Sequence, residues 1–333
     1  MKKLAYSLLP LGITVGLCLN IAPASATLLV RNVIPDAALS IDGFGSLSNN
    51  GVIQANIPTG SIIQRAYLYA ASVWNNPVNG VTFHGNALSV GSATILGPDE
   101  NPATTARWDV TSIIDSSFTG GLQDFSILEN GQNDGAVLVV AYSNPSTQGF
   151  TSVILDGELS TKGDTVQFDF VSPYTGGDFL VSLASSYSRQ PSEQFTQIDV
   201  TTNSTNNRRL TTSAGGQDDG EGDDGALITV GGIGDDPTNP GPLDSPFGGP
   251  RIDDEYYNLA LGNSANSAPF ISAGDKYLRL KTANPSNDDN VFGMFITSGF
   301  KITVTPVPEP SMTLGIFGIG AIGILLSRLG KKS

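Results

Sequence analysis

Apolar and polar residues alternate along much of the chain, which is the pattern of strands with one buried face. Residues 164–171 show it clearly, because Val166, Phe168 and Phe170 alternate with polar or charged neighbours. Residues 135–142 are instead continuously apolar, which predicts a central strand buried on both faces. No long amphipathic helix pattern occurs between residues 27 and 305. Further strands are predicted at residues 27–33, 62–74, 81–83, 108–114, 125–129, 150–159, 179–187, 195–201, 226–230, 256–260 and 277–281.

The last predicted strand covers residues 292–304. Its apolar residues share one parity, with only Ser298 interrupting and Ser298-Gly299 as a candidate bulge: Phe292, Met294, Ile296, Phe300, Ile302 and Val304. This number of strands predicts an all-β fold, a jelly-roll-like β-sandwich that is one large sandwich or two adjacent ones. Residues 203–254 are rich in Gly, Asp, Asn, Thr and Pro. They predict a long acidic loop in which only residues 226–230 look ordered.

The N-terminal end has the composition of a secretory signal peptide. Lys2 and Lys3 precede an apolar helical stretch over residues 4–21, and Ala24-Ser25-Ala26 supplies small residues for cleavage. We therefore assign residues 1–26 to the signal peptide and residues 27–305 to the β-sandwich body. An N-terminal membrane anchor is the less favoured alternative, because a strand pattern starts directly after the small residues. The only cysteine, Cys18, lies in the signal, so the body has no disulfide.

The C-terminal end, residues 306–333, combines three features in order. A short proline motif comes first, made of Val307, Pro308, Glu309 and Pro310. An apolar run over residues 312–326 follows and predicts a transmembrane helix, and the basic residues after it are expected to stay cytoplasmic. This arrangement resembles the PEP-CTERM sorting signal, which an exosortase recognises and processes. An ordinary single-pass tail anchor is the alternative.

The resemblance to the PEP-CTERM signal implies a location and a partner. The host would be a Gram-negative-type bacterium that makes exopolysaccharide. The protein would be exported, anchored in the inner membrane before processing by the exosortase, and then found at the cell surface or outside the cell. Exopolysaccharide is the further partner that this setting implies.

Charge narrows the range of partners. The chain has 17 Lys and Arg residues against 31 Asp and Glu residues, a formal net charge of −14. Five of the basic residues and one of the acidic residues belong to the two ends, so the body keeps 12 and 30. Such an acidic body excludes nucleic acid as a partner and favours solubility and divalent cations.

Few residues are available for catalysis. His84 is the only histidine, and Phe83-His84-Gly85-Asn86 reads as a hairpin turn rather than as part of a triad. The G-x-S-x-G, H-E-x-x-H and G-x-x-x-x-G-K-[ST] motifs do not occur. We therefore expect no enzyme activity, although a pair of carboxylates for glycan hydrolysis stays open, because their separation is a property of space.

Calcium is the cofactor that the acidic turns favour, because Ca²⁺ is bound by hard oxygens on flexible loops. The best local cage is the run before the last strand, made of Asn287, Asp288, Asp289 and Asn290. Residues 219–223 and 231–236 resemble parts of an EF-hand loop and of a β-roll repeat, but neither motif is complete. For all three, a solvated loop or an Asx-turn is the alternative.

Aromatic residues could bind sugar. Tyr67 and Tyr69 share one face of a strand that Trp74 follows, and core packing is the favoured interpretation. The body also resembles a group of uncharacterised exported bacterial β-sandwich proteins, through residues 65–70, 108–111, 133–142 and 284–290. That resemblance implies a fold and a place on the cell surface, but no activity.

These observations favour a non-enzymatic surface or extracellular-matrix protein associated with exopolysaccharide or biofilm. The alternatives are a carbohydrate- or Ca²⁺-dependent adhesion module and a secreted glycan hydrolase.

Overall fold

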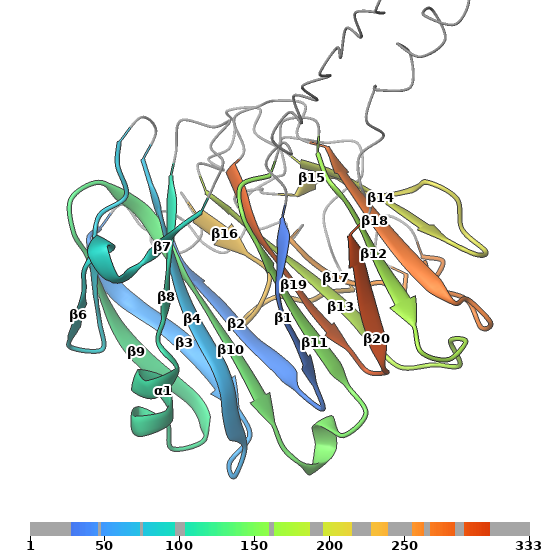
Figure 1. Ribbon diagram of the computed structural model, residues 1–333, viewed down its shortest axis with the longest axis horizontal. Helices are drawn as coiled ribbons and strands as arrows, with labels where there is room; N and C mark the ends of the chain where they lie inside the picture. The colour runs from blue at the N-terminus through green and yellow to red at the C-terminus, as the bar shows by residue number, and fades with distance from the viewer. Residues whose placement is uncertain are drawn as a thin grey trace, which may run out of the picture.

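The chain forms four antiparallel β-sheets stacked face to face, as the layers of Figure 1 show. The structure is a computed structural model that describes residues 28–45, 48–73, 76–96, 104–159, 163–186, 196–214, 228–238, 255–262, 267–283 and 290–306. Of these residues 58% are in strands and 6% in helices, which confirms the predicted all-β sandwich class. The predicted signal peptide, most of the predicted sorting segment and much of the predicted acidic loop lie outside the described residues.

The first two sheets make one sandwich. Sheet I is four-stranded, in the order β3 (Asn50–Ile57), β9 (Gly121–Glu129), β5 (Val81–Phe83) and β6 (Asn86–Leu88). Sheet II is five-stranded, in the order β2 (Ala38–Phe44), β10 (Asn133–Ser143), β4 (Ile62–Ser72), β8 (Thr105–Asp109) and β7 (Thr94–Ile95). The helix α1 (Thr111–Ser117) and the 3₁₀ turns η1 (Val90–Ser92) and η2 (Pro145–Thr147) join strands at the ends.

The other two sheets make a second sandwich. Sheet III is in the order β1 (Leu29–Pro35), β11 (Thr151–Asp156), β19 (Asn290–Ser298), β13 (Phe179–Ser186) and β16 (Ile228–Val230), and β17 (Tyr256–Asn258) also pairs with β13. Sheet IV is in the order β15 (Arg208–Ala214), β14 (Thr196–Thr202), β18 (Tyr277–Ala283), β12 (Thr165–Phe170) and β20 (Ile302–Pro306).

The two sandwiches repeat one topology. In the first, let β2, β3, β4, β5, β6, β8, β9 and β10 be strands 1 to 8. Sheet II then has the order 1-8-3-6 and sheet I the order 2-7-4-5. In the second, strands 1 to 8 are, in chain order, β11, β12, β13, β14, β15, β16, β18 and β19. With this numbering, sheet III has the order 1-8-3-6 and sheet IV the order 2-7-4-5. This is the strand order of a jelly roll, so the body is two jelly rolls in tandem.

The jelly rolls pack through their 1-8-3-6 sheets, so that sheets II and III are covered on both faces. The apolar run of β10 shows why, because Ala136, Leu138 and Val140 face sheet I while Val137 and Val139 face sheet III. This confirms the expectation that β10 is a central strand buried on both faces. Of the two arrangements left open, one large sandwich or two adjacent ones, the fold has two, in face-to-face contact.

The predicted last strand is wrong in two respects. It is two strands in different sheets, because the chain turns at Ser298–Lys301 from β19 of sheet III to β20 of sheet IV. The apolar side chains also do not all face one side of the sheet. Phe292 packs between sheets II and III, whereas Met294 packs between sheets III and IV. A register shift near Gly293, opposite Ala184, inserts an extra residue and reverses the side that Phe292 faces.

The strand predicted at residues 108–114 is also wrong. β8 ends at Asp109, whose carboxylate accepts a hydrogen bond from the backbone N–H of Thr111 at 3.0 Å and turns the chain into α1. Val110 and Ile114, four residues apart, then pack into the same core, which is helical spacing. In addition, β15 lies within residues 203–254, for which the composition predicts a long loop. Leu210 is buried there, and Arg209 pairs with Asp199 of β14 at 2.6 Å.

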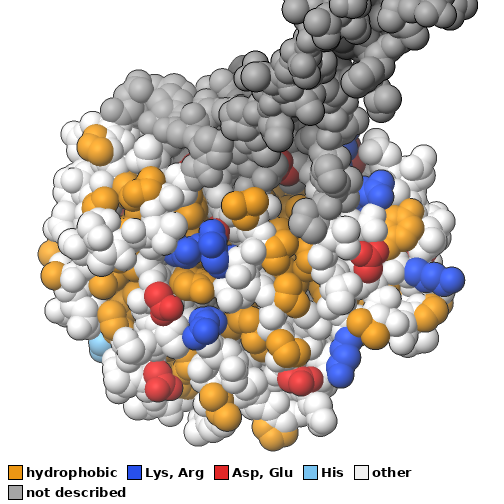
Figure 2. Space-filling model, viewed as in Figure 1, with side chains coloured by type: hydrophobic (Ala, Val, Ile, Leu, Met, Phe, Trp, Pro, Cys, Tyr) orange, Lys and Arg blue, Asp and Glu red, His pale blue; other side chains and the backbone are white. Residues whose placement is uncertain are grey.

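The surface is mixed in character. On the face in Figure 2, basic and acidic side chains are interspersed among hydrophobic and uncharged ones, without a continuous field of one sign.

Candidate functional site

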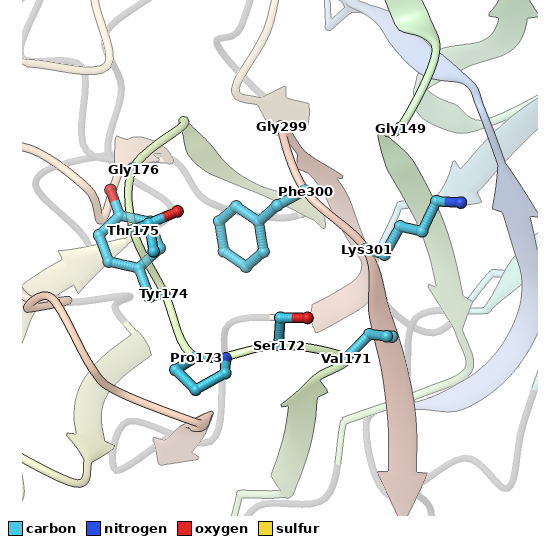
Figure 3. A pocket seen from close by; sticks show the side chains of 10 residues that line it. All are labelled: Gly149, Val171, Ser172, Pro173, Tyr174, Thr175, Gly176, Gly299, Phe300 and Lys301. Carbon is cyan, nitrogen blue, oxygen red and sulfur yellow. The ribbon is translucent and has the colours of Figure 1, made fainter.

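A surface hollow of about 330 Å³ lies at one end of the second jelly roll. One wall is the turn between β12 and β13, residues 171–176, and the other is the corner between β19 and β20, residues 299–301, with Gly149 at the rim (Figure 3). These segments are more than a hundred residues apart in sequence. The hollow exists because β12 and β20 are paired neighbours in sheet IV.

Two aromatic rings form the apolar part of the hollow. The ring of Phe300 lies 5.2 Å from that of Tyr174 at an interplanar angle of 61°, and 5.0 Å from that of Phe170 at 79°. Phe300 and Tyr174 are half-buried and pack on the core of the second jelly roll. In Figure 3 the two rings are neighbours, and the side chain of Lys301 points away from them. The rings therefore present apolar surface in the hollow, and the exposed ammonium group of Lys301 is directed away from that surface.

Hydrogen bonds hold both walls in place. The Tyr174 hydroxyl donates to the carbonyl oxygen of Gly177 at 2.9 Å, and the N–H of Val171 donates to the carbonyl oxygen of Lys301 at 3.0 Å. Burial, and next the charge of Asp178, raise the pKa of Tyr174, so its hydroxyl stays protonated as a donor. The hollow is thus preformed.

The hollow combines the groups that a sugar ring needs. Aromatic faces take the apolar C–H face of a sugar, while the exposed Ser172 and Thr175 offer hydroxyl groups to its oxygens. Sequence reasoning missed this site. It treated Phe300 as a core residue of a long strand and did not select Tyr174, and only the pairing of β12 with β20 brings the two together.

A second, wider hollow of about 520 Å³ is bordered by residues 39–41, β13 and the turn that follows β16. That turn is the Gly-rich segment 231–236 considered for calcium. Asp235 accepts a hydrogen bond from the N–H of Gly232, and Asp236 accepts one from the N–H of Thr238 at 2.9 Å. The Asp236–Thr238 bond has the geometry of an Asx-turn, and both carboxylates accept hydrogen bonds within this segment.

The structure shows where Tyr67, Tyr69 and His84 lie. Tyr67 and Tyr69 are buried between sheets II and III, which confirms core packing over sugar binding; Trp74 lies outside the described residues. His84 is in the two-residue β5–β6 turn, as predicted, with φ of 47° and 78° at His84 and Gly85. The centroid of its imidazole ring lies 5.3 Å from that of the Phe125 ring, in an edge-to-face arrangement.

The predicted calcium cage and sorting motif fall mainly outside the described residues. Asn287, Asp288 and Asp289 are not described, and Asn290 is the first residue of β19. Val307, Pro308, Glu309 and Pro310 follow directly after β20 and are not described either. Within the described ranges, no group of three or more His, Cys, Asp or Glu residues could hold a metal ion, and no helix has the length and apolar character to span a membrane.

Comparison with known proteins identifies the C-terminal segment. Residues 306–331 match the model of the PEP-CTERM protein-sorting motif. This confirms the sorting signal predicted at residues 306–333, and with it an exported protein that an exosortase sorts and processes after membrane anchoring. A search of curated proteins finds no match to the chain.

Proposed function

We propose that this exported, exosortase-sorted protein is a non-enzymatic polysaccharide-binding protein of the cell surface or extracellular matrix. The hollow beside Tyr174 and Phe300 would take a sugar unit of the exopolysaccharide. The single observation that supports this most is the preformed pairing of half-buried aromatic rings with exposed hydroxyl groups in one hollow of about 330 Å³. A volume of this size accommodates one or two sugar rings.

The position of the hollow relative to the sorting motif supports the proposal. The hollow borders the start of β20, at residues 299–301, and the matched motif begins at Pro306, where β20 ends. Five strand residues span roughly 17 Å. The hollow therefore lies at the end of β20 away from the sorting segment. A chain held in the membrane by that segment would present the hollow outward, where polysaccharide accumulates.

Affinity electrophoresis tests the proposal. The purified full-length chain is run through gels with and without the extracellular polysaccharide of the producing cells. Tyr174→Leu keeps apolar packing but removes the ring, and Ser172→Ala removes a hydroxyl group that lines the hollow. Each variant is expected to raise the dissociation constant for the polysaccharide, obtained from the retardation, roughly tenfold. This corresponds to a loss of about 1.4 kcal/mol of binding free energy. Ser126→Ala is the matched control, because Ser126 is an exposed serine on β9, outside the residues that line the hollow.

The result that overturns the proposal is retardation of both variants equal to that of the unaltered chain. Melting curves recorded on the same samples show whether Tyr174→Leu still folds. If polysaccharide is degraded during the runs, the protein is a glycan hydrolase and the non-enzymatic part of the proposal is wrong.

A further inference from the structure

Two buried carboxylates lie at one end of the apolar layer between sheets I and II. Glu129, the last residue of β9, is 4% exposed, and Asp134, the second residue of β10, is 1% exposed. Glu129 has the same parity as Phe125 and Ile127, so its side chain points into the layer rather than to solvent. The pairing of β10 with β4 shifts register between Asn133 and Gly135, which leaves Asp134 as an extra residue at a bulge.

Among the residues that the structure describes, no basic side chain forms an ion pair with Glu129. Its Oε1 atom is buried and has no hydrogen-bond partner. The ion pairs among the described residues join Asp156 and Asp199 to arginines and do not include Glu129. Burial, and next the charge of the nearby acid Asp134, raise the pKa of Glu129 to about 8. A shared cation relieves such a pair and also supplies the missing partner of Oε1.

The segments around the two acids are held by hydrogen bonds. Asn79 and Asn133 bond reciprocally, through Asn79 N–H to Asn133 Oδ1 at 2.8 Å and Asn133 Nδ2 to the Asn79 carbonyl oxygen at 3.2 Å. The N–H of Glu129 donates to the carbonyl oxygen of Asn49 at 2.7 Å. Gly131, with φ of 67°, lies so close to Asn79 that a Cβ there would be 2.6 Å from its side chain. The turn between β9 and β10 is therefore rigid and rich in backbone and amide oxygens.

The tandem topology adds an independent observation. β10 and β19 are the eighth strands of their jelly rolls, so the segments that connect β9 to β10 and β18 to β19 hold equivalent places in the strand order. The second turn contains Asn287, Asp288 and Asp289, and the first leads into Asn133 and Asp134. Both jelly rolls thus have an Asn-Asp pair at the entry to the same strand.

We propose that Glu129 and Asp134 bind a divalent cation of the calcium class and thereby close this end of the first jelly roll. The ligands on offer are carboxylate, amide and carbonyl oxygens, without histidine or cysteine, which suits Ca²⁺ and not Zn²⁺. Two carboxylates leave the remaining positions to neutral oxygens, which Ca²⁺ accepts. The site is in the other jelly roll from the Tyr174–Phe300 hollow, so it does not depend on the proposed function.

Thermal melting and titration calorimetry of the full-length chain test this site, with CaCl₂ as the only added ligand after treatment with chelator. Millimolar Ca²⁺ is expected to raise the melting temperature of the unaltered chain by roughly 2–5 °C. Glu129→Gln keeps the side-chain volume and removes the charge. It is expected to bind one Ca²⁺ fewer and to lose this rise, while its melting temperature in chelator is no lower than that of the unaltered chain. Asp124→Asn is the control, because Asp124 is on the exposed face of the same strand.

Two results overturn the proposal: an unaltered chain whose melting temperature Ca²⁺ does not change, or a Glu129→Gln variant with the calcium stoichiometry and melting shift of the unaltered chain. The second result would place calcium elsewhere, for example at residues 287–290. If the variant does not fold, an anomalous difference map from crystals grown with Ca²⁺ decides, through a peak between Glu129 and Asp134 or its absence.

Discussion

Arg107 and Asp156 form a buried ion pair across the interface between the two jelly rolls. Arg107 is on β8 of sheet II and Asp156 ends β11 of sheet III, and the Arg107 Nη1 atom donates to Asp156 Oδ2. The carboxylate also accepts from Arg31 Nη2 at 2.9 Å and from the Tyr69 hydroxyl at 3.1 Å. Burial, and next the charge of Asp156, raise the pKa of Tyr69 well above its usual value, which keeps its hydroxyl as a donor. This network fixes how sheet II of the first jelly roll lies on sheet III of the second.

Replacing Asp156 is expected to destabilise the whole body. In Asp156→Asn the buried Arg107 guanidinium loses its counter-charge, and removing one partner of a buried pair costs about 3–5 kcal/mol. Unfolding in guanidinium chloride measures the loss. Asp199→Asn is the control, because its partner Arg209 is 35% exposed and such pairs contribute only about 0–1 kcal/mol. Equal losses in the two variants would contradict a special role for the buried pair.

Gly135 is expected to tolerate no side chain. Its φ is 151°, and a Cβ there would lie 2.2 Å from Ile228 Cγ2 and 2.3 Å from the carbonyl oxygen of Phe44. Gly135→Ala must therefore separate β10 from β16, at a cost of more than about 3 kcal/mol on thermal unfolding. Gly60→Ala is the comparison, since Gly60 also has a positive φ but open space around it, and the expected cost is about 1 kcal/mol. A melting temperature for Gly135→Ala above that of Gly60→Ala would contradict the close approach.

The Pro-Glu-Pro motif is expected to be read by the processing enzyme and not to stabilise the body. Replacing Pro308, Glu309 and Pro310 with Ala should leave the melting temperature unchanged, because the described core ends with β20. In cells, the variant should remain in the inner membrane at precursor mass, whereas the unaltered protein is processed. Fractionation and immunoblotting distinguish the two. Equal processing of both proteins would argue for a simple membrane anchor.

The predicted calcium cage at residues 287–290 can be separated from the Glu129–Asp134 site. Replacing Asp288 and Asp289 with Ala should remove one Ca²⁺ from the titration and part of the calcium-dependent rise in melting temperature, since a ligand of the native state stabilises by mass action. The Glu129→Gln change should remove a different Ca²⁺, so the combined variant should lose both. An unchanged titration after the Asp288 and Asp289 replacements leaves the Asx-turn interpretation for that segment.

The sequence by itself determined the C-terminal sorting signal and the all-β class of the body. Charge, apolar length and the Pro-Glu-Pro motif are local properties, so the sorting signal could be identified without coordinates. Period-two alternation located most strands, and the continuous apolar run of β10 indicated burial on both faces. The His84-Gly85 turn was also readable, because a two-residue hairpin turn depends on local backbone angles.

Only the tertiary structure decided which strands pair and which distant residues meet. Asp156 meets Arg107 over a separation of 49 residues, and Tyr174 meets Phe300 because β12 pairs with β20. The bulge at Gly293 changes the side that Phe292 faces, and a period-two pattern contains no sign of an inserted residue. The duplicated jelly roll was hidden for the same reason: strand order is set by long-range packing of apolar faces, and unrelated strand sequences can meet that requirement equally well.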